Sequence, residues 1–432
     1  MASKFKFTKT EKGWILYDWA NSVFATNMVA AIFPIYFANI CAANGADNVV
    51  LWSYGTSAAT FTVALLAPIL GSAGDYSGMK KKFFTLFMLL GVAFTLFNAF
   101  TDNYILMLVG YVIAHIGFSG ANLFYDSFLT DVTTDERMDK VSAWGYAMGY
   151  IGGSTIPFLI SIALLLAMDY SMFAMKLVIT ITALWWAVFS IPFLKNVKQI
   201  HSIPHPKDGI VRSAFGNLFH TARDIFKVRG ILLFMLAYFF YIDGVNTVIS
   251  ISTSYGSKLG LDSTGMILAL LVTQIVAVPF SILFGRLSSK VGSIRMITIA
   301  IGIYFVICGL GFFMGFNIEQ HNTSPESVQF SQILFWILAF CVGTVQGGIQ
   351  ALSRSYFGKL IPVERSNEYF GFFDIFGKFA AVVGPLLVAM FTQLTGRDSI
   401  GVLSLMILFF CGGVILLTGK KHFAEAELQS NA

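Results

Sequence analysis

The amino-acid sequence predicts an all-α membrane protein with twelve transmembrane helices in two pseudo-symmetric six-helix bundles. Three observations predict this fold: the chain is very apolar, its apolar runs are long enough to cross a bilayer, and its two halves resemble each other. Of 432 residues, 56% are hydrophobic and only 12% are charged, and the mean hydropathy is +0.74. Soluble domains carry about 25% charged residues, so a soluble enzyme, a secreted disulfide-rich domain and a disordered chain are excluded.

The apolar segments approach or exceed the ~20 residues that a transmembrane helix requires. They are far longer than the ~10-residue strands of membrane β-barrels, which favours helices. The expected spans are 14–40, 52–73, 83–101, 104–130, 141–168, 172–194, 230–254, 263–285, 294–316, 328–352, 368–392 and 398–418. The polar stretch 195–229 divides six spans from six. It predicts an N-terminal bundle at 1–194, a linker with short interfacial helices at 195–229, and a C-terminal bundle at 230–432.

Lysine and arginine residues lie almost entirely on one side of these spans. Of the 28 basic residues, 24 fall in the two termini, the central linker and the loops after the even-numbered spans. Such a bias marks the cytoplasmic side of a membrane protein. We therefore expect a multi-pass protein, in a bacterial cytoplasmic membrane, with both termini in the cytoplasm. The net charge of +5 then reflects topology, and no nucleic-acid partner is expected.

Two patterns recur in both halves. Glycines seven residues apart follow span 2, at Gly71–Gly78, and span 8, at Gly285–Gly292, an offset of 214 residues. A D-x-x-N pattern occurs in span 1 at Asp18–Asn21 and in span 7 at Asp243–Asn246, an offset of 225 residues. Similar offsets favour a duplicated six-helix unit. Repeats of this kind build transporters, whose substrate sites lie near the middle of the membrane.

Polar residues inside the spans concentrate in spans 1, 4, 7 and 10, whereas spans 3, 6, 9 and 12 are almost purely apolar. Helix positions 3, 4, 7 and 11 residues apart share a face, so each polar set forms a stripe. We expect the four stripes to converge on one water-filled path. The candidate residues of the substrate or proton pathway in these spans are Asp18, Asn21, His115, Asn122, Asp126, Asp243, Asn246, Gln346, Gln350 and Arg354.

Each candidate also has a purely structural interpretation. Hydroxyl and amide side chains commonly form hydrogen bonds between membrane helices, whereas an intramembrane carboxylate favours a functional role. His115 could titrate or could be packed and hydrogen-bonded, and Arg354 could gate the path or bind a carboxylate. In span 11, Asp374 and Lys378 lie one helical turn apart and form either a structural ion pair or a substrate or gate contact.

Several chemistries leave no signature in the sequence. No nucleotide-binding P-loop, zinc-protease motif or serine-hydrolase motif is present, so neither an ATP-driven pump nor an enzyme is expected. The four cysteines lie in or beside apolar runs without metal or disulfide spacing. We expect no metal and no cofactor. In span 5, Gly145, Gly149 and Gly153 predict a face on which another helix packs closely.

The segment Gly71–Lys80 resembles the signature loop of the major facilitator superfamily, with Asp75 four residues after Gly71, then Gly78 and Lys80. The second copy, at Gly285–Gly292, carries Ser289 in place of the aspartate. More specific runs are Trp14–Ser22, Phe33–Phe37, Gly347–Ser355 and Gly377–Pro385. They are similar to the "unknown major facilitator" family, bacterial relatives of the fungal autophagy-related vacuolar amino-acid effluxers.

The resemblance implies the major facilitator fold, in which helices 1, 4, 7 and 10 line the cavity. It also implies that Asp75 and its loop latch helix ends on the cytoplasmic side. The expected function is secondary transport of a small polar solute, an amino acid or similar metabolite, outward and by alternating access, with proton coupling as an option. Alternatives are an amphipathic or lysolipid-like substrate, and a non-transporting receptor or scaffold. The expected partners are the solute, protons and the lipid bilayer, and no oligomer is required.

Overall fold

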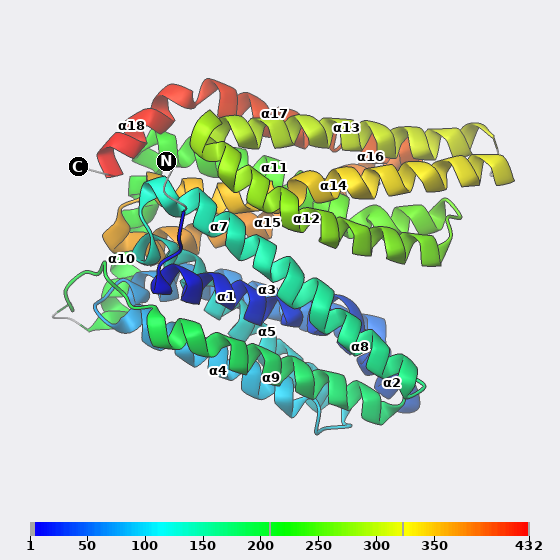
Figure 1. The fold of residues 1–432 in the computed structure, drawn as a ribbon, viewed down its shortest axis with the longest axis horizontal. Coiled ribbons are helices and arrows are strands. Elements are labelled where there is room, and N and C mark those ends of the chain that lie inside the picture. The colour runs from blue at the N-terminus through cyan, green and yellow to red at the C-terminus, as the bar shows by residue number, and fades with distance from the viewer. Residues whose placement is uncertain (1–4, 207–208, 322–323, 431–432) are drawn as a thin grey trace. The chain divides into compact units, whose positions relative to one another are not determined.

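A computed structural model describes residues 5–206, 209–321 and 324–430. The described residues are almost entirely helical (Figure 1), and eleven of their helices are long and apolar enough to cross a membrane. The remaining expected span, span 3 at 83–101, corresponds to α4 (Met79–Phe97). This helix carries three lysines in its first turn. Because of these charges, it is not among the eleven helices that are apolar enough to cross a membrane. The chain is a multi-pass membrane protein, as predicted.

The helices divide between two compact units. Unit 1 comprises residues 1–222 together with the segment Pro362–Asp374, and unit 2 comprises residues 223–361 and 375–432. The first half of the chain forms α1 (Lys9–Phe24), η1 (Ala25–Ala31), α2 (Ile32–Ala43), α3 (Asn48–Gly74), α4, α5 (Tyr104–Ser127), α6 (Leu129–Val132), α7 (Asp135–Gly149), η2 (Tyr150–Thr155), α8 (Ile156–Ala167), α9 (Met172–Asn196) and α10 (Ile210–Lys227).

The remaining elements follow α10 with short connections. They are α11 (Arg229–Lys258), α12 (Ser263–Val291), α13 (Ser293–Gln320), α14 (Pro325–Leu360), η3 (Val363–Arg365), α15 (Ser366–Thr395), α16 (Asp398–Leu403), α17 (Met406–Thr418) and α18 (Lys420–Ser430). The predicted span ends differ from these by several residues. Apolar composition marks only the part of a helix that lies in lipid, whereas helices such as α14 continue with polar turns at either end.

Side-chain caps fix where several helices begin. At α1 the hydroxyl of Thr8 accepts from the backbone N–H of Glu11, and the Glu11 carboxylate accepts from the N–H of Thr8. This reciprocal pair satisfies two N–H groups that a helix start leaves free. Asp47 caps α3 and Asn103 caps α5 by accepting from two backbone N–H groups each. The polar residues between the spans therefore set the helix boundaries.

Aromatic rings fill the interior of unit 1 where α1, α4, α5 and α9 meet. Tyr17 packs against Phe84, Tyr125 and Phe193, with ring centroids 4.8–5.3 Å apart. The indole N–H of Trp14 donates to the Tyr125 carbonyl oxygen over 2.8 Å, so this buried polar group is satisfied. Such rings bury large areas and favour specific relative orientations. They hold α1 and α5, the helices of the first two predicted polar stripes, in a fixed register.

The glycine face predicted in span 5 packs against α1, as expected. A Cβ atom on Gly149 would lie 2.8 Å from the Ser22 hydroxyl, and one on Gly153 would collide with the backbone of Ser22. Two π-helical segments, η1 and η2, lie beside this contact and touch each other. Small residues let membrane helices approach closely, and the same approach brings α7 and η2 onto the face of α1 that carries Asp18 and Ser22.

Candidate functional site

The polar stripes of spans 1 and 4 meet inside unit 1. The hydroxyl of Tyr125 donates to Oδ2 of Asp18 over 2.7 Å. One turn along, Nδ2 of Asn21 donates to Oδ1 of Asn122 over 2.5 Å. Asp18 and Asn122 are half-buried, whereas Asn21 is buried. The structure thus places one carboxylate and two amides side by side, a set that offers hydrogen-bond donors, acceptors and a charge.

The other two candidates on α5 lie on either side of Asn122. Nδ1 of His115 lies 3.2 Å from the hydroxyl of Tyr111, and the imidazole packs edge-on against Phe24 and Phe118. Asp126 is half-buried and directly follows Tyr125 near the end of the helix. Aromatic rings make up most of the surroundings of His115. This environment is typical of a packed histidine rather than a solvated one.

Asp243 on α11 is completely buried in unit 2, and both of its oxygens have partners. Oδ2 accepts from the backbone N–H of Gly384 over 2.9 Å, and Oδ1 accepts from the Thr247 hydroxyl over 3.3 Å. Gly384 precedes Pro385 inside α15, where the proline interrupts the helical hydrogen bonding. The carboxylate therefore joins α11 to α15 at a weakened point of that helix.

The remaining polar candidates lie on α11, α14 and α15. Gln346 and Arg354 are buried, and Gln350 and Asn246 are half-buried. Next to Arg354, the hydroxyl of Ser353 lies 2.7 Å from that of Tyr241, which ties α14 to α11. Asp374 and Lys378 are half-buried, one turn apart on α15. The boundary between the two units falls between these residues, so Asp374 belongs to unit 1 and Lys378 belongs to unit 2.

Asp75 of the signature loop binds the N-terminus of α15. Its Oδ1 accepts from the backbone N–H and from the side-chain Nδ2 of Asn367, each over 2.9 Å, and its Oδ2 accepts from the N–H of Glu368 over 3.0 Å. The free N–H groups and the dipole at a helix N-terminus favour an anion there. The carboxylate is nonetheless buried, and burial raises the pKa of Asp75 to about 7, against the opposing effects of Lys80 and the backbone donors.

Two glycines of the loop are required by its geometry. A Cβ on Gly71 would lie 2.5 Å from the carbonyl oxygen of Asn367, so α3 could not approach α15 with any other residue there. Gly78 has φ +72°, a left-handed conformation that side chains disfavour, and it immediately precedes α4. Both positions match the family motif, and the structure gives a steric reason for glycine at each of them.

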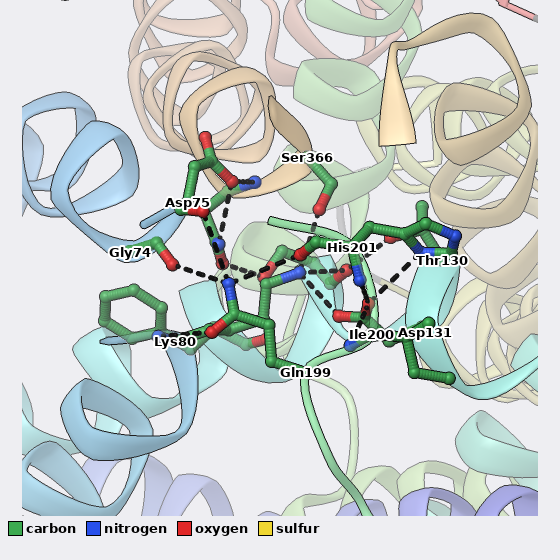
Figure 2. Close-up of polar contacts among 12 residues, drawn as sticks. Gly74, Asp75, Lys80, Thr130, Asp131, Gln199, Ile200, His201 and Ser366 are labelled. Atoms are coloured by element: carbon green, nitrogen blue, oxygen red, sulfur yellow. Dashed lines mark hydrogen bonds and ion pairs between the residues drawn. The ribbon is translucent and has the colours of Figure 1, made fainter. Parts of the chain in front are cut away.

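Lys80 forms the second part of this contact, shown in Figure 2. Its Nζ lies 2.7 Å from Oδ2 of Asp131 and 2.9 Å from the hydroxyl of Ser366, the first residue of α15. Neither side chain of the Lys80–Asp131 pair is exposed. A buried ion pair needs further hydrogen bonds to offset desolvation, and Asp131 has them. Its Oδ1 accepts from the backbone N–H groups of Ile200 and His201 over 2.9 and 2.8 Å.

The linker after α9 completes the cluster. The side-chain amide of Gln199 lies between the signature loop and the linker, accepting from the Lys80 N–H and donating to the Gly74 carbonyl oxygen (Figure 2). Ile203 pairs with Tyr76 as a short parallel bridge. We call Asp75, Lys80, Asp131, the linker segment 199–203 and the start of α15 (Ser366–Glu368) the latch cluster.

The charges of the latch cluster influence one another. Nδ1 of His201 lies 3.2 Å from Oδ1 of Asp131. Burial raises the pKa of Asp131, but Lys80 and the hydrogen bonds from His201 outweigh burial, so the pKa is lowered overall. The hydrogen bond to Asp131 raises the pKa of His201 above its usual value despite partial burial. Asp131 therefore stays ionised at neutral pH, whereas Asp75 and His201 can change charge there.

The second copy of the loop is built differently. Helix α12 continues through Gly285 to Val291, where Gly292 ends it with φ +95°. Ser289 is exposed, and its hydroxyl donates to the carbonyl oxygen of Arg286 within the same helix. This hydrogen bond therefore stays within α12. Ser289 thus binds within its own helix, whereas Asp75 binds the N-terminus of α15.

Of the latch cluster, only Asp75 and Lys80 were predicted from the sequence, and the unpredicted residues include Asp131, Gln199 and Asn367. Asp131 lies in α6, directly after the predicted span 104–130, and Gln199 lies in the linker predicted at 195–229. A partial signal existed at Asn367, because Ser366 and Asn367 are typical of helix starts. Among the described residues, no group of three or more His, Cys, Asp or Glu side chains is placed to hold a metal ion.

The fold and the latch cluster define a membrane transporter of the major facilitator type. Solved structures of such transporters match most of the chain. The proton:xylose symporter XylE has a TM-score of 0.68, 12% identity and coverage of 95% of this chain and 94% of that chain. The E. coli fucose:proton symporter FucP has a TM-score of 0.69 and 13% identity. This match covers 95% of this chain and 97% of that chain. At these identities the likeness concerns the fold alone.

Sequence comparisons place the chain more narrowly. It belongs to the family described as vacuole effluxer Atg22 like, whose model matches residues 8–427. It is 47% identical to the uncharacterized MFS-type transporter YxiO of Bacillus subtilis, over 95% of each chain. It is 23% identical to autophagy-related protein 22 of Pichia angusta, over 89% of this chain and 86% of that protein. The resemblance seen in the sequence is confirmed, and the chain is a transporter.

Proposed function

We propose that the chain exports a small polar solute, an amino acid or a similar metabolite, by alternating access. The observation that carries this proposal is the polar set of unit 1, where Asp18 accepts from Tyr125 and Asn21 donates to Asn122. A half-buried carboxylate with adjacent amides suits the ammonium, hydroxyl and carboxylate groups of such a solute. An intramembrane carboxylate is costly unless it has a function or a partner.

Asp18 is the first candidate for contact with the solute or with a coupled proton. It is half-buried, whereas Asp243 is completely buried, and it accepts a hydrogen bond from the neutral hydroxyl of Tyr125. Asp243 is the second candidate, because both of its oxygens already bind Gly384 and Thr247. The wider proposed pathway comprises Asp18, Asn21, His115, Asn122, Asp126, Asp243, Asn246, Gln346, Gln350, Arg354, Asp374 and Lys378.

The latch cluster is proposed to stabilise one conformation of the transport cycle. Asp75 and Lys80 bind the start of α15 in this conformation, and in the alternative conformation these contacts break. We propose that the two bundles, residues 1–194 and 230–432, move about the linker 195–229. We propose that this cluster lies, together with both termini, on the cytoplasmic side of a bacterial membrane, a proposal that the positive charge bias supports.

Flux measurements on the purified chain in proteoliposomes test the proposal. Vesicles are loaded with a panel of labelled amino acids and related metabolites, and efflux is followed with and without a proton gradient. Asp18→Asn should reduce efflux at least tenfold. Asp169→Asn is a matched control, because Asp169 is exposed and its positive φ suits asparagine equally well. Its efflux should equal that of the wild-type chain.

The outcomes separate the proposal from its alternatives. Wild-type efflux in the Asp18→Asn variant would remove Asp18 from the site. Flux of lysolipids but of no polar solute would favour an amphipathic substrate. A chain that binds a ligand yet shows no flux under any gradient would favour a receptor or scaffold.

A further inference from the structure

A basic pocket opens beside the latch cluster at the N-terminal end of α4. It has a volume of about 540 Å³, and its walls include Lys81, Lys82, Thr85, Leu86, Leu89 and Lys198. Lys82 and Lys198 are exposed. Among the described residues, no carboxylate lies within ion-pair distance of either lysine. Three ammonium groups around one opening repel one another and favour an anion.

Lys81 is fixed in place within this pocket. Its Nζ donates to the carbonyl oxygens of Leu194 and Val197 at the end of α9, over 2.6 and 2.7 Å. These bonds use two of its three donors and leave one for a ligand. A positively charged group near a helix C-terminus is also stabilised by the helix dipole. The pocket therefore has one ammonium group held in place by hydrogen bonds and two exposed ones.

The apolar wall continues along the same face of α4. Lys82, Leu86 and Leu89 follow at offsets of four and seven residues, so their side chains share one face of the helix. Leu86 is 59% exposed and Leu89 is 55% exposed on the surface of unit 1. A charged rim above exposed leucines fits a molecule with an anionic head and apolar chains. A soluble anion would make no use of the leucines.

We propose that this pocket binds the phosphate headgroup of an anionic phospholipid, whose acyl chains lie along Leu86 and Leu89. Basic pockets at the membrane surface bind such headgroups, and each lysine near the surface contributes about a fivefold gain in affinity. The proposal concerns a lipid site and is independent of the transported solute.

Lipid binding would also act on the latch cluster. Gln199 belongs to the pocket wall and binds both the Lys80 N–H and the Gly74 carbonyl oxygen. Its neighbour Lys198 belongs to the pocket as well. A headgroup held by Lys198 restricts the linker segment that follows it. Bound anionic lipid should therefore slow the opening of segment 199–203.

The full chain, purified in detergent, is titrated with phosphatidylglycerol, with phosphatidylcholine of the same acyl chains, and with glycerol phosphate. Binding is followed by native mass spectrometry for the lipids and by the melting midpoint for all three. Phosphatidylglycerol should bind most tightly. The double variant Lys82→Gln/Lys198→Gln should bind it about 25-fold more weakly, from about fivefold per lysine. Lys290→Gln/Lys420→Gln, at exposed lysines elsewhere, should bind it normally.

Each contrary result overturns a part of the proposal. Unchanged phosphatidylglycerol affinity in the Lys82/Lys198 variant would overturn the site. Equal binding of phosphatidylcholine would overturn the requirement for an anionic head. Equally tight binding of glycerol phosphate would overturn a lipid as the occupant. Hydrogen exchange at 199–203 that does not slow on addition of phosphatidylglycerol would overturn the coupling to the latch cluster.

Discussion

Nζ of Lys80 lies 2.7 Å from Oδ2 of Asp131, and neither side chain is accessible to solvent. Lys80 belongs to the start of α4 and Asp131 to the short helix α6, so the pair joins these two helices of unit 1. Through Ser366 and the linker amides, the same two side chains also hold α15 and residues 200–201. One buried ion pair therefore organises four segments that are far apart in the sequence.

Replacing Asp131 by asparagine should strongly destabilise the chain. The substitution leaves the Lys80 ammonium buried without its counter-charge, and removing one partner of a buried pair costs about 3–5 kcal/mol. Thermal unfolding of the purified chain in detergent measures the effect. Asp102→Asn is the control, because Asp102 pairs with Lys176 in a largely exposed ion pair, where the cost should be about 1 kcal/mol or less. Equal midpoints for the two variants would contradict the prediction.

Replacing Asp75 by asparagine should loosen the start of α15. The variant keeps one oxygen acceptor, but its NH2 group replaces the other acceptor and cannot accept a hydrogen bond from the start of α15. We expect faster hydrogen exchange at the amides of Asn367 and Glu368, by about tenfold, measured by mass spectrometry. Ser289→Asn is the matched control from the second copy of the loop, because Ser289 is exposed. Exchange that is equally fast in both variants would show that Asp75 does not hold α15.

The sequence predicted the fold more fully than the latch cluster. The apolar spans, the glycine face around Gly149 and the loop at Asp75 each have a local pattern, so a single chain reveals them. Asp131 and Gln199 have none, because what matters about them is their position after folding. The linker was predicted only as a polar connection with short interfacial helices, yet its N–H groups at residues 200 and 201 supply the hydrogen bonds that let the Lys80–Asp131 pair be buried. Local propensity cannot indicate which of several loop carboxylates will meet a lysine.

Stability of the latch cluster should fall as the pH rises from about 6 to about 8. The hydrogen bond to Asp131 raises the pKa of His201 in the folded state. Its contribution is therefore fully present below the unfolded pKa of ~6.5 and is lost as the pH rises through the folded pKa. Asp75, whose pKa is raised to about 7 by burial, acts in the same direction, because its protonated form is favoured more in the folded than in the unfolded state.

Hydrogen exchange of segment 199–203, corrected for the intrinsic effect of pH, tests this dependence. Charged groups facing His201 include Asp131, Lys80 and Glu364, and Asp131 stays ionised over this range because its pKa is lowered. His201→Gln should remove most of the pH dependence in this segment. His205→Gln, at the exposed histidine of the same linker, should retain it. A wild-type chain whose segment 199–203 opens equally at both pH values would contradict the assignment.

Adding a methyl group at Gly384 should separate α11 from α15. A Cβ atom there would lie 2.8 Å from Oδ1 of Asp243 and would collide with the Thr247 hydroxyl. The bond between the Gly384 N–H and Asp243 would be strained or lost, and overpacking of this kind costs about 1–3 kcal/mol. We expect a lower melting midpoint for Gly384→Ala.

Gly302→Ala provides the comparison for Gly384. A Cβ at Gly302 on α13 would meet nothing within 4 Å, and alanine is favoured over glycine in a helix by about 1 kcal/mol. That variant should be neutral or slightly more stable in the same melting assay. Because both changes replace a helical glycine by alanine, the difference between their midpoints isolates the contact with Asp243. A Gly384→Ala chain as stable as Gly302→Ala would mean that α15 can shift without loss, and that Asp243 does not anchor it.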